Sequence, residues 1–274
     1  MLMQIVRHAV HPSTWRAWCV ALAALTCGAL AMLPAAAQAE GLPALVARVK
    51  PSIVLVGTLS ATDAPRFQFR GTGFAVGDGR LIITSAHVLP DSLAAPAGGV
   101  RSPAIQVLRN GQWSPQPVRV KVSNAMYDLA VLEVDGAPLS PLALEEGAAA
   151  VAEGADIALV GFPLGIALGY SHVSHRGVLA AITDVAPLAQ TGGSLTARAA
   201  QQLRAGNFSI LQLDVTAFPG NSGGPVFDLE SGRVIGVLAM GLIKGTKESA
   251  ISVPTGISFA VPVARVLELL KRGD

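Results

Sequence analysis

Cysteine is almost absent from this chain. Only Cys19 and Cys27 occur among its 274 residues, and both lie within the first 39. A mature chain that begins at Glu40 therefore has no cysteine, which excludes a disulfide-stapled fold and a metal site built on thiolates. It does not need such staples, because about 235 residues can bury a substantial hydrophobic core.

Charge is also scarce, at 14% of the residues. Of the 20 basic side chains, Arg7 and Arg16 lie in the first 39 residues, so 18 basic side chains balance 18 acidic ones in the rest of the chain. A protein that binds nucleic acid or an anionic surface usually carries an excess of positive charge. Neither is expected as a partner.

The first 39 residues have the pattern of a secretory signal peptide. They contain two arginines and no acid, then an apolar stretch over residues 17–33, then Ala37-Gln38-Ala39 before Glu40. A basic start, an apolar centre and small residues at the exit are typical of a cleaved leader. We therefore expect an exported protein, periplasmic or extracellular. Retention of residues 17–33 as an uncleaved membrane anchor is the alternative.

Short runs of Val, Ile and Leu, separated by Gly, Pro, Asn and Asp, dominate the rest of the chain. Runs of this length and spacing favour an all-β barrel or sandwich over alternating strands and helices. We expect one domain over residues 40–274.

A serine flanked by glycines stands out against this background. Ser222 lies in Gly220-Asn221-Ser222-Gly223-Gly224-Pro225, between strand-like runs at 210–215 and 233–238. Glycines allow an exposed hydroxyl and a close approach of backbone N–H groups, which nucleophilic catalysis with an oxyanion hole requires. Such a serine also needs a base.

The histidines supply a base almost by elimination. Of five, His8 and His11 lie in the leader, and His172 and His175 share a segment that looks like a loop. His87 remains, at the end of the apolar run 81–88. Asp128, which opens the alternating run 128–134, is the candidate third member.

The order His87, Asp128, Ser222 discriminates between folds that share this chemistry. Gly220-x-Ser222-x-Gly224 also fits the nucleophile elbow of α/β-hydrolases, but that fold needs a histidine after the serine, and none follows Ser222. A subtilisin-type order needs a parallel sheet with long crossover helices, which the pattern does not indicate. The chymotrypsin order remains.

In its motifs the chain resembles the HtrA (Deg) branch of the trypsin-like serine proteases. Five segments carry the resemblance in the family's order: Gly71-Thr72-Gly73-Phe74 with Thr84-Ser85-Ala86-His87-Val88, Tyr127-Asp128-Leu129-Ala130-Val131-Leu132, Gly161-Phe162-Pro163-Leu164-Gly165, Gly220-Asn221-Ser222-Gly223-Gly224-Pro225, and Ile257-Ser258-Phe259-Ala260-Val261-Pro262. The resemblance implies a chymotrypsin-like fold of two six-stranded antiparallel β-barrels, roughly residues 50–135 and 155–262, with a cleft between them and a short C-terminal helix.

The resemblance also implies the role of each site residue. His87 would be the general base, Asp128 the group that orients it, and Ser222 the nucleophile. The N–H groups of Gly220 and Ser222 would form the oxyanion hole. Asn221 stands where digestive relatives carry an aspartate that pairs with a newly cut N-terminus, so activation by zymogen cleavage is not expected.

The specificity pocket is likewise placed by resemblance. Thr216, six residues before Ser222, would form its floor, with Met240, Gly241 and Ile257 around it. None of these side chains is acidic, so aliphatic residues rather than Lys or Arg are expected to fit.

Three further expectations concern regulation and assembly. Residues 183–207 resemble in position the HtrA sensor loop, with a plain surface insertion as the alternative. Relatives are often trimers through their N-terminal segment, here around 42–49, so a homotrimer is an option. HtrA proteins commonly carry PDZ domains, whereas residues 261–270 look like the closing helix of the protease domain, and no PDZ domain is expected.

The i, i+3 spacing of His172 and His175 could place two ligands on one metal, but two histidines with few carboxylates nearby do not make a zinc site. No metal and no cofactor are expected. The sequence thus predicts an exported serine endopeptidase that cleaves unfolded or damaged proteins. The alternatives are a non-catalytic chaperone or binding module on the same scaffold, and an esterase-like hydrolase.

Overall fold

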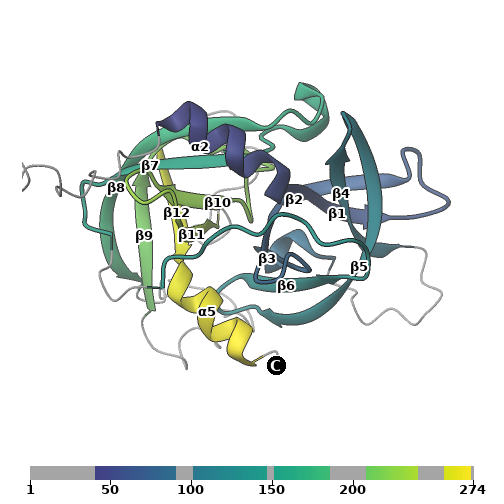
Figure 1. Ribbon diagram of the computed structural model, residues 1–274. Helices are drawn as coiled ribbons and strands as arrows, with labels where there is room; N and C mark the ends of the chain where they lie inside the picture. The colour runs from purple at the N-terminus through teal and green to yellow at the C-terminus, as the bar shows by residue number, and fades with distance from the viewer. Residues whose placement is uncertain (1–40, 91–100, 147–150, 186–207, 240–255, 273–274) are drawn as a thin grey trace, which may run out of the picture. The chain divides into compact units, whose positions relative to one another are not determined.

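Two closed antiparallel barrels, each of six strands, form the described part of the chain (Figure 1). The computed structural model describes residues 41–90, 101–146, 151–185, 208–239 and 256–272. The strand order is β1-β2-β3-β6-β5-β4 in the first barrel and β10-β11-β12-β9-β8-β7 in the second. The all-β class with two six-stranded barrels and a short C-terminal helix is therefore confirmed.

The first barrel uses strands between residues 53 and 134, and the second uses strands between residues 156 and 262. Their bounds are β1 (Ile53–Leu59), β2 (Phe67–Val76), β3 (Leu81–Ser85), β4 (Ser102–Arg109), β5 (Gln112–Asn124) and β6 (Leu129–Val134), then β7 (Asp156–Gly161), β8 (Val173–Val185), β9 (Phe208–Asp214), β10 (Pro225–Asp228), β11 (Val234–Leu238) and β12 (Ile257–Pro262).

One hydrophobic cluster runs through both barrels. Phe74 and Leu129 of the first barrel belong to the same buried cluster as Phe162 and Phe227 near or in the second, and all four are 0% exposed. Two further clusters fill the barrel interiors. Strands β1 and β11 are buried on both faces, one in a barrel interior and the other in the shared cluster, which is why they are apolar runs rather than alternating ones.

Aromatic rings join the barrels beside this cluster. Phe162, just after β7, lies 5.4 Å from Trp113 of β5 and 4.5 Å from His172, measured between ring centroids. His172 Nε2 donates to the carbonyl oxygen of Ile53 on β1, 3.3 Å away. The edge-on pair of Phe162 with Trp113, the tilted pair of Phe162 with His172 and this hydrogen bond connect segments that are far apart in the sequence.

Two helices flank the barrels: α2 (Leu42–Val49) lies in the upper part of the view in Figure 1, and α5 (Val263–Arg272) in the lower part. In α5, Val266 and Leu269 are buried, and the Arg265 guanidinium lies 4.9 Å from the centre of the Tyr127 ring. The helix expected at 261–270 is present, shifted by two residues, because β12 continues to Pro262. Short 3₁₀ turns cover Lys50–Ser52, Ala86–Val88 and Gly165–Leu168.

The segment that carries His172 and His175 differs from the expected loop. Strand β8 begins at Val173, so His175 is a strand residue paired with Leu159 of β7. A run of Ser, His and Arg with little apolar character gave no strand pattern, yet pairing with β7 makes it one. The described residues contain no group of three or more His, Cys, Asp or Glu that could hold a metal ion.

Several expectations concern residues outside the described ranges. These are the leader with both cysteines, most of the segment 183–207, and the pocket residues Met240 and Gly241. No helix within the described ranges is long and apolar enough to cross a membrane.

Acidification should weaken the fold through the two histidines of this region. Burial lowers the pKa of His172 below its ordinary value, and the charge of Lys50 lowers it further, against an opposing effect of the Ile53 hydrogen bond. Burial also lowers the pKa of His175. Below about pH 6.5 these histidines bind protons more readily in the unfolded chain than in the folded one. Lowering the pH therefore lowers the free energy of unfolding, by at most about 1.4 kcal/mol per pH unit for each histidine.

Urea unfolding of the wild type and of His172→Phe, His175→Phe and the double variant, each at pH 7.5 and 5.5, measures this loss. The double variant should show the smallest difference between the two pH values. An equal pH dependence in the wild type and the double variant would contradict this explanation.

Candidate active site

Asp128 and His87 come together at the ends of two neighbouring strands. β3 pairs with β6, and Ser85 lies opposite Leu129. His87 follows in the 3₁₀ turn after β3, and Asp128 immediately precedes β6. Asp128 has a positive φ of 55°, a conformation that aspartate tolerates better than most residues. Its carbonyl oxygen accepts a hydrogen bond of 2.9 Å from the Ala86 N–H, which joins the two turns.

The Asp128 carboxylate binds His87 twice. One oxygen, Oδ1, accepts from the His87 backbone N–H at 2.9 Å, and Oδ2 lies 2.6 Å from Nδ1 of the ring. Asp128 is only 1% exposed, so water competes little for these bonds. Holding the proton on Nδ1 leaves Nε2 as an acceptor, which is the tautomer that a general base needs.

The turn that carries Ser222 requires glycine on both sides. Gly220 and Gly223 have φ values of 103° and 84°. A Cβ at Gly220 would lie 2.3 Å from the Phe162 carbonyl oxygen, and one at Gly223 would lie 2.3 Å from that of Thr72. Any larger residue would push the turn away from the strands against which it packs.

Thr72 of β2 holds this turn in place. Its backbone N–H donates to the Ser222 carbonyl oxygen at 2.9 Å, and its hydroxyl donates to the Gly220 carbonyl oxygen at 2.7 Å. The same hydroxyl accepts from the Phe162 N–H at 3.2 Å. Thr72 is fully buried, and its own carbonyl oxygen accepts from the Thr84 hydroxyl at 2.7 Å. Sequence reasoning noted Thr72 only as part of a motif, although a threonine between glycines at the buried centre of a strand is a sign of a polar role.

The serine turn and the histidine turn share an anchor. The carbonyl oxygen of Leu238 accepts from the Gly223 N–H at 2.8 Å and from the Ser85 hydroxyl at 3.2 Å. The residue after the serine is thus tied beside the strand end that leads to His87. Among the described residues, the Ser222 hydroxyl makes no hydrogen bond to His87, and Ser222 is 6% exposed, less than its glycine flanks led us to expect. Such bonds are often loose in a free enzyme and tighten on substrate binding.

Two N–H groups of the turn have no partner in the part of the chain that the structure describes. Those of Asn221, Gly223 and Gly224 donate to Phe218, Leu238 and Asn221 carbonyl oxygens. Those of Gly220 and Ser222 donate to no atom of the described residues. These are the two N–H groups expected to form an oxyanion hole, and they are available to a substrate oxygen.

Asn221 is buried, at 1% exposure, and its amide oxygen and nitrogen have no hydrogen-bond partner among the described residues. The amide packs against Gly161, where an added Cβ would lie 2.7 Å from Oδ1. An aspartate here would be an unpaired buried charge, which costs far more than an unpaired amide. The position thus suits a neutral side chain.

The described part of the expected specificity pocket lies at the ends of β9 and β12. Thr216 follows β9 and is half-buried, and Ile257 opens β12 with 49% of its surface exposed. The Ser258 hydroxyl donates to the Val215 carbonyl oxygen at 2.7 Å, which fixes the two strand ends together.

Known proteins with similar sequences are serine proteases. A family profile for the trypsin-like peptidase domain matches residues 71–237. The serine protease Do-like HtrA of Lactococcus lactis subsp. lactis (strain IL1403) is 27% identical over 223 residues, covering 79% of this chain and 47% of that protein. Human serine protease HTRA4 is 27% identical over 230 residues, covering 83% and 40% respectively. The chain thus spans less than half the length of these relatives.

Solved structures share the fold at low sequence identity. The active form of the Rv3671c protease from M. tuberculosis superposes with a TM-score of 0.57 at 20% identity, covering 83% of this chain and 82% of that one. Deg5 superposes with a TM-score of 0.55 at 22% identity, covering 82% and 89%. The chain therefore belongs to the family of trypsin-like peptidase domains, and its relatives within that family are HtrA serine proteases.

Proposed function

We propose that this protein is an exported serine endopeptidase that cleaves unfolded or damaged proteins through an acyl-enzyme intermediate. One observation carries the proposal: His87 is bound through Nδ1 by the buried Asp128, next to the serine turn, where the N–H groups of Gly220 and Ser222 donate to no atom of the described residues. A base, a nucleophile and an oxyanion site in one place are the minimum for acyl transfer.

The reaction follows from these positions. His87 Nε2 takes the proton of the Ser222 hydroxyl as Oγ attacks the carbonyl carbon of the substrate, and the oxygen of the tetrahedral intermediate accepts from the Gly220 and Ser222 N–H groups. The imidazolium, stabilised by Asp128, then gives its proton to the leaving amine as the C–N bond breaks. Water, activated by His87 in the same way, hydrolyses the acyl ester and restores Ser222.

Catalysis is favoured over a chaperone role because the His87–Asp128 geometry has no purpose in simple binding. A peptide substrate is favoured over a small ester because the relatives are named as proteases. Export rests on the leader pattern of residues 1–39 and unfolded substrates rest on the HtrA resemblance.

Removing the nucleophile, base or orienting group should abolish or greatly reduce turnover. Ser222→Ala and His87→Ala should each leave no measurable hydrolysis of an unfolded protein, and Asp128→Asn should cost about 10⁴-fold in kcat by misplacing the imidazole proton. Ser231→Ala, at an exposed serine between β10 and β11, is the matched control. Hydrolysis that survives in purified Ser222→Ala sinks the mechanism.

Thr72→Val should uncouple activity from stability. Valine keeps the β-branched shape but loses the hydroxyl bonds to Gly220 and Phe162, so the turn loses its support. A displaced Gly220 N–H should cost about 10²-fold in kcat, whereas the free energy of unfolding should fall by only about 1–3 kcal/mol.

The control for this variant is Thr58→Val, a buried threonine of β1 that pairs with Gln68 and Pro103 rather than with the serine turn. Peptide hydrolysis beside urea unfolding is the measurement. Equal activity in the two valine variants would show that the Thr72 hydroxyl does not support the turn.

Cleavage-site profiling should show aliphatic residues before the scissile bond. The expected pocket floor, Thr216, has no charge to pair with Lys or Arg, and Ile257 beside it presents apolar surface. Mass spectrometry of peptides released from an unfolded protein gives the profile. A strong preference for Lys or Arg would show that the pocket is placed wrongly.

A further inference from the structure

A groove of about 610 Å³ lies on the first barrel where β1 and β2 meet. Its lining is mostly apolar and includes Leu59, Pro65, Phe67, Pro115 and Tyr170, with Arg66 beside them. The volume lies within the range of sites that bind small molecules or side chains. None of these residues has a role in the mechanism above.

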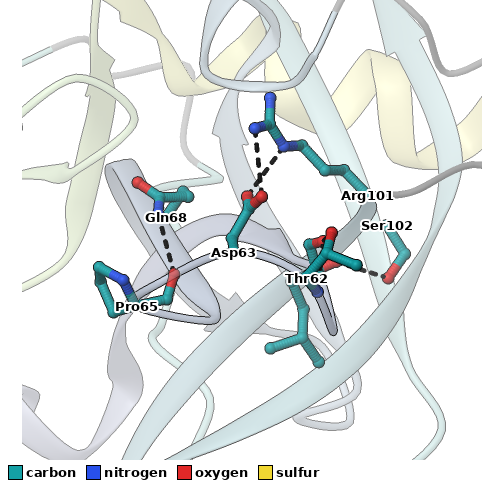
Figure 2. Close-up of polar contacts among 8 residues, drawn as sticks. Thr62, Asp63, Pro65, Gln68, Arg101 and Ser102 are labelled. Carbon is teal, nitrogen blue, oxygen red and sulfur yellow. Dashed lines mark hydrogen bonds and ion pairs between the residues drawn. The ribbon is translucent and has the colours of Figure 1, made fainter.

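The wall formed by the β1–β2 hairpin is held by a set of polar contacts (Figure 2). The Ser60 N–H donates to the Arg66 carbonyl oxygen at 2.9 Å, and Gln68 Nε2 donates to that of Pro65 at 2.9 Å. Figure 2 shows Arg101 of the neighbouring chain segment reaching Asp63, with nitrogen–oxygen distances of 2.9 and 3.3 Å. Because this wall is already fixed, little conformational entropy is lost when a ligand fills the groove.

Strand β2 leads from the groove to the nucleophile. Phe67 lines the groove, and Gly71, four residues further along β2, is so close to Ser222 that an added Cβ would lie 2.8 Å from the serine carbonyl oxygen. Between Phe67 and Gly71, the Phe69 ring lies near both Tyr170 of the groove and Gly220 of the serine turn. It lies 5.6 Å from the Tyr170 ring, and a Cβ at Gly220 would be 3.1 Å from it. The groove and the proposed oxyanion turn therefore lie at the two ends of one segment of β2, with the Phe69 ring between them.

The length of this path sets the substrate position. Four strand residues span about 13 Å, and an extended peptide covers a similar length in about four residues. The expected acyl-side pocket, at Thr216 and Ile257, belongs to the second barrel, whereas the groove is lined by strands of the first barrel together with Tyr170. A substrate whose acyl side fills that pocket would therefore run along β2 with the part that follows the scissile bond.

The positive charge of Arg66 at the rim of the groove favours an acidic residue in the substrate. Arg66 is exposed and makes no ion pair among the described residues, while the nearby Asp63 carboxylate is already bound by Arg101. An acidic side chain next to the residue that fills the groove would meet an unpaired guanidinium.

We propose that this groove binds an apolar side chain about four residues after the scissile bond of a polypeptide substrate, with an acidic residue beside it facing Arg66. The proposal rests on the proposed endopeptidase function and extends it to a binding site on the leaving-group side. A substrate would then be selected by two separated anchors rather than by the residue before the bond alone.

Quenched-fluorescent peptides of one length test this with the purified full chain. All carry Val before the cleaved bond, and the fourth residue after it is Leu or Ser, followed by Glu or Gln. Leu should raise kcat/KM at least tenfold over Ser, mainly through a lower KM, and Glu should raise it about threefold over Gln. The same Leu placed four residues before the bond should give no such gain.

Matched variants assign the gain to the groove. Ala61→Trp, which fills the groove with a large ring, should remove the Leu gain, measured as the ratio of Leu to Ser peptides within the variant. Ala137→Trp, at another exposed alanine, should keep it. Arg66→Gln should remove the Glu gain, and Arg272→Gln, at the exposed end of α5, should keep it.

A Leu gain that persists in Ala61→Trp, or that is equal on both sides of the bond, overturns the proposal. If the wild type cleaves none of the peptides, the endopeptidase function fails, and the groove is then tested by fluorescence anisotropy. A labelled peptide with only the leaving-group half should bind Ser222→Ala and lose binding at least tenfold when Ala61→Trp is added. Equal affinity of the two proteins would overturn the groove independently.

Discussion

The hydrogen bonds of Thr72 join the two barrels at the point where chemistry is proposed. Its N–H and hydroxyl bind the Ser222 and Gly220 carbonyl oxygens, at 2.9 and 2.7 Å, and both partners belong to the turn before the second barrel's β10. With the two carbonyl oxygens held against the first barrel, the Gly220 and Ser222 N–H groups have no partner among the described residues. A single buried threonine thus supports the orientation that an oxyanion site needs.

Packing makes this constraint rigid. The Thr72 hydroxyl also accepts from the Phe162 N–H, and Phe162 is fully buried among Trp113, His172 and Phe69. The barrels share one hydrophobic cluster around these rings. Close-packed interiors resist small displacements, so His87, carried by the first barrel, and Ser222, held by Thr72, keep a fixed relation without any disulfide.

Local patterns in the sequence predicted an all-β barrel or sandwich and placed His87 and Asp128 at strand ends, and the resemblance to HtrA proteases supplied the two six-stranded barrels. The binding of His87 by Asp128 follows from the pairing of β3 with β6, which brings the two strand ends together. The roles of Thr72 and Phe162 could not be predicted from local patterns. Thr72 binds Gly220, 148 residues further along the chain, and Phe162, 90 residues further along. His175 was misjudged for the same reason: its strand exists because β7 and β9 pair with it. The groove beside Phe67 also combines β1, β4, β5 and Tyr170, which no sequence window contains.

Covalent labelling with a fluorophosphonate probe tests the central claim most directly, since the probe reacts only with a serine that has both a base and an oxyanion site. The account predicts that one equivalent of probe is bound per active chain, that tryptic mass spectrometry places it on Ser222, and that Thr72→Val slows the labelling about 10²-fold while its fold persists. Rapid labelling of Ser222 in Thr72→Val would contradict the dependence of the site on Thr72, and labelling at another serine would contradict the site itself.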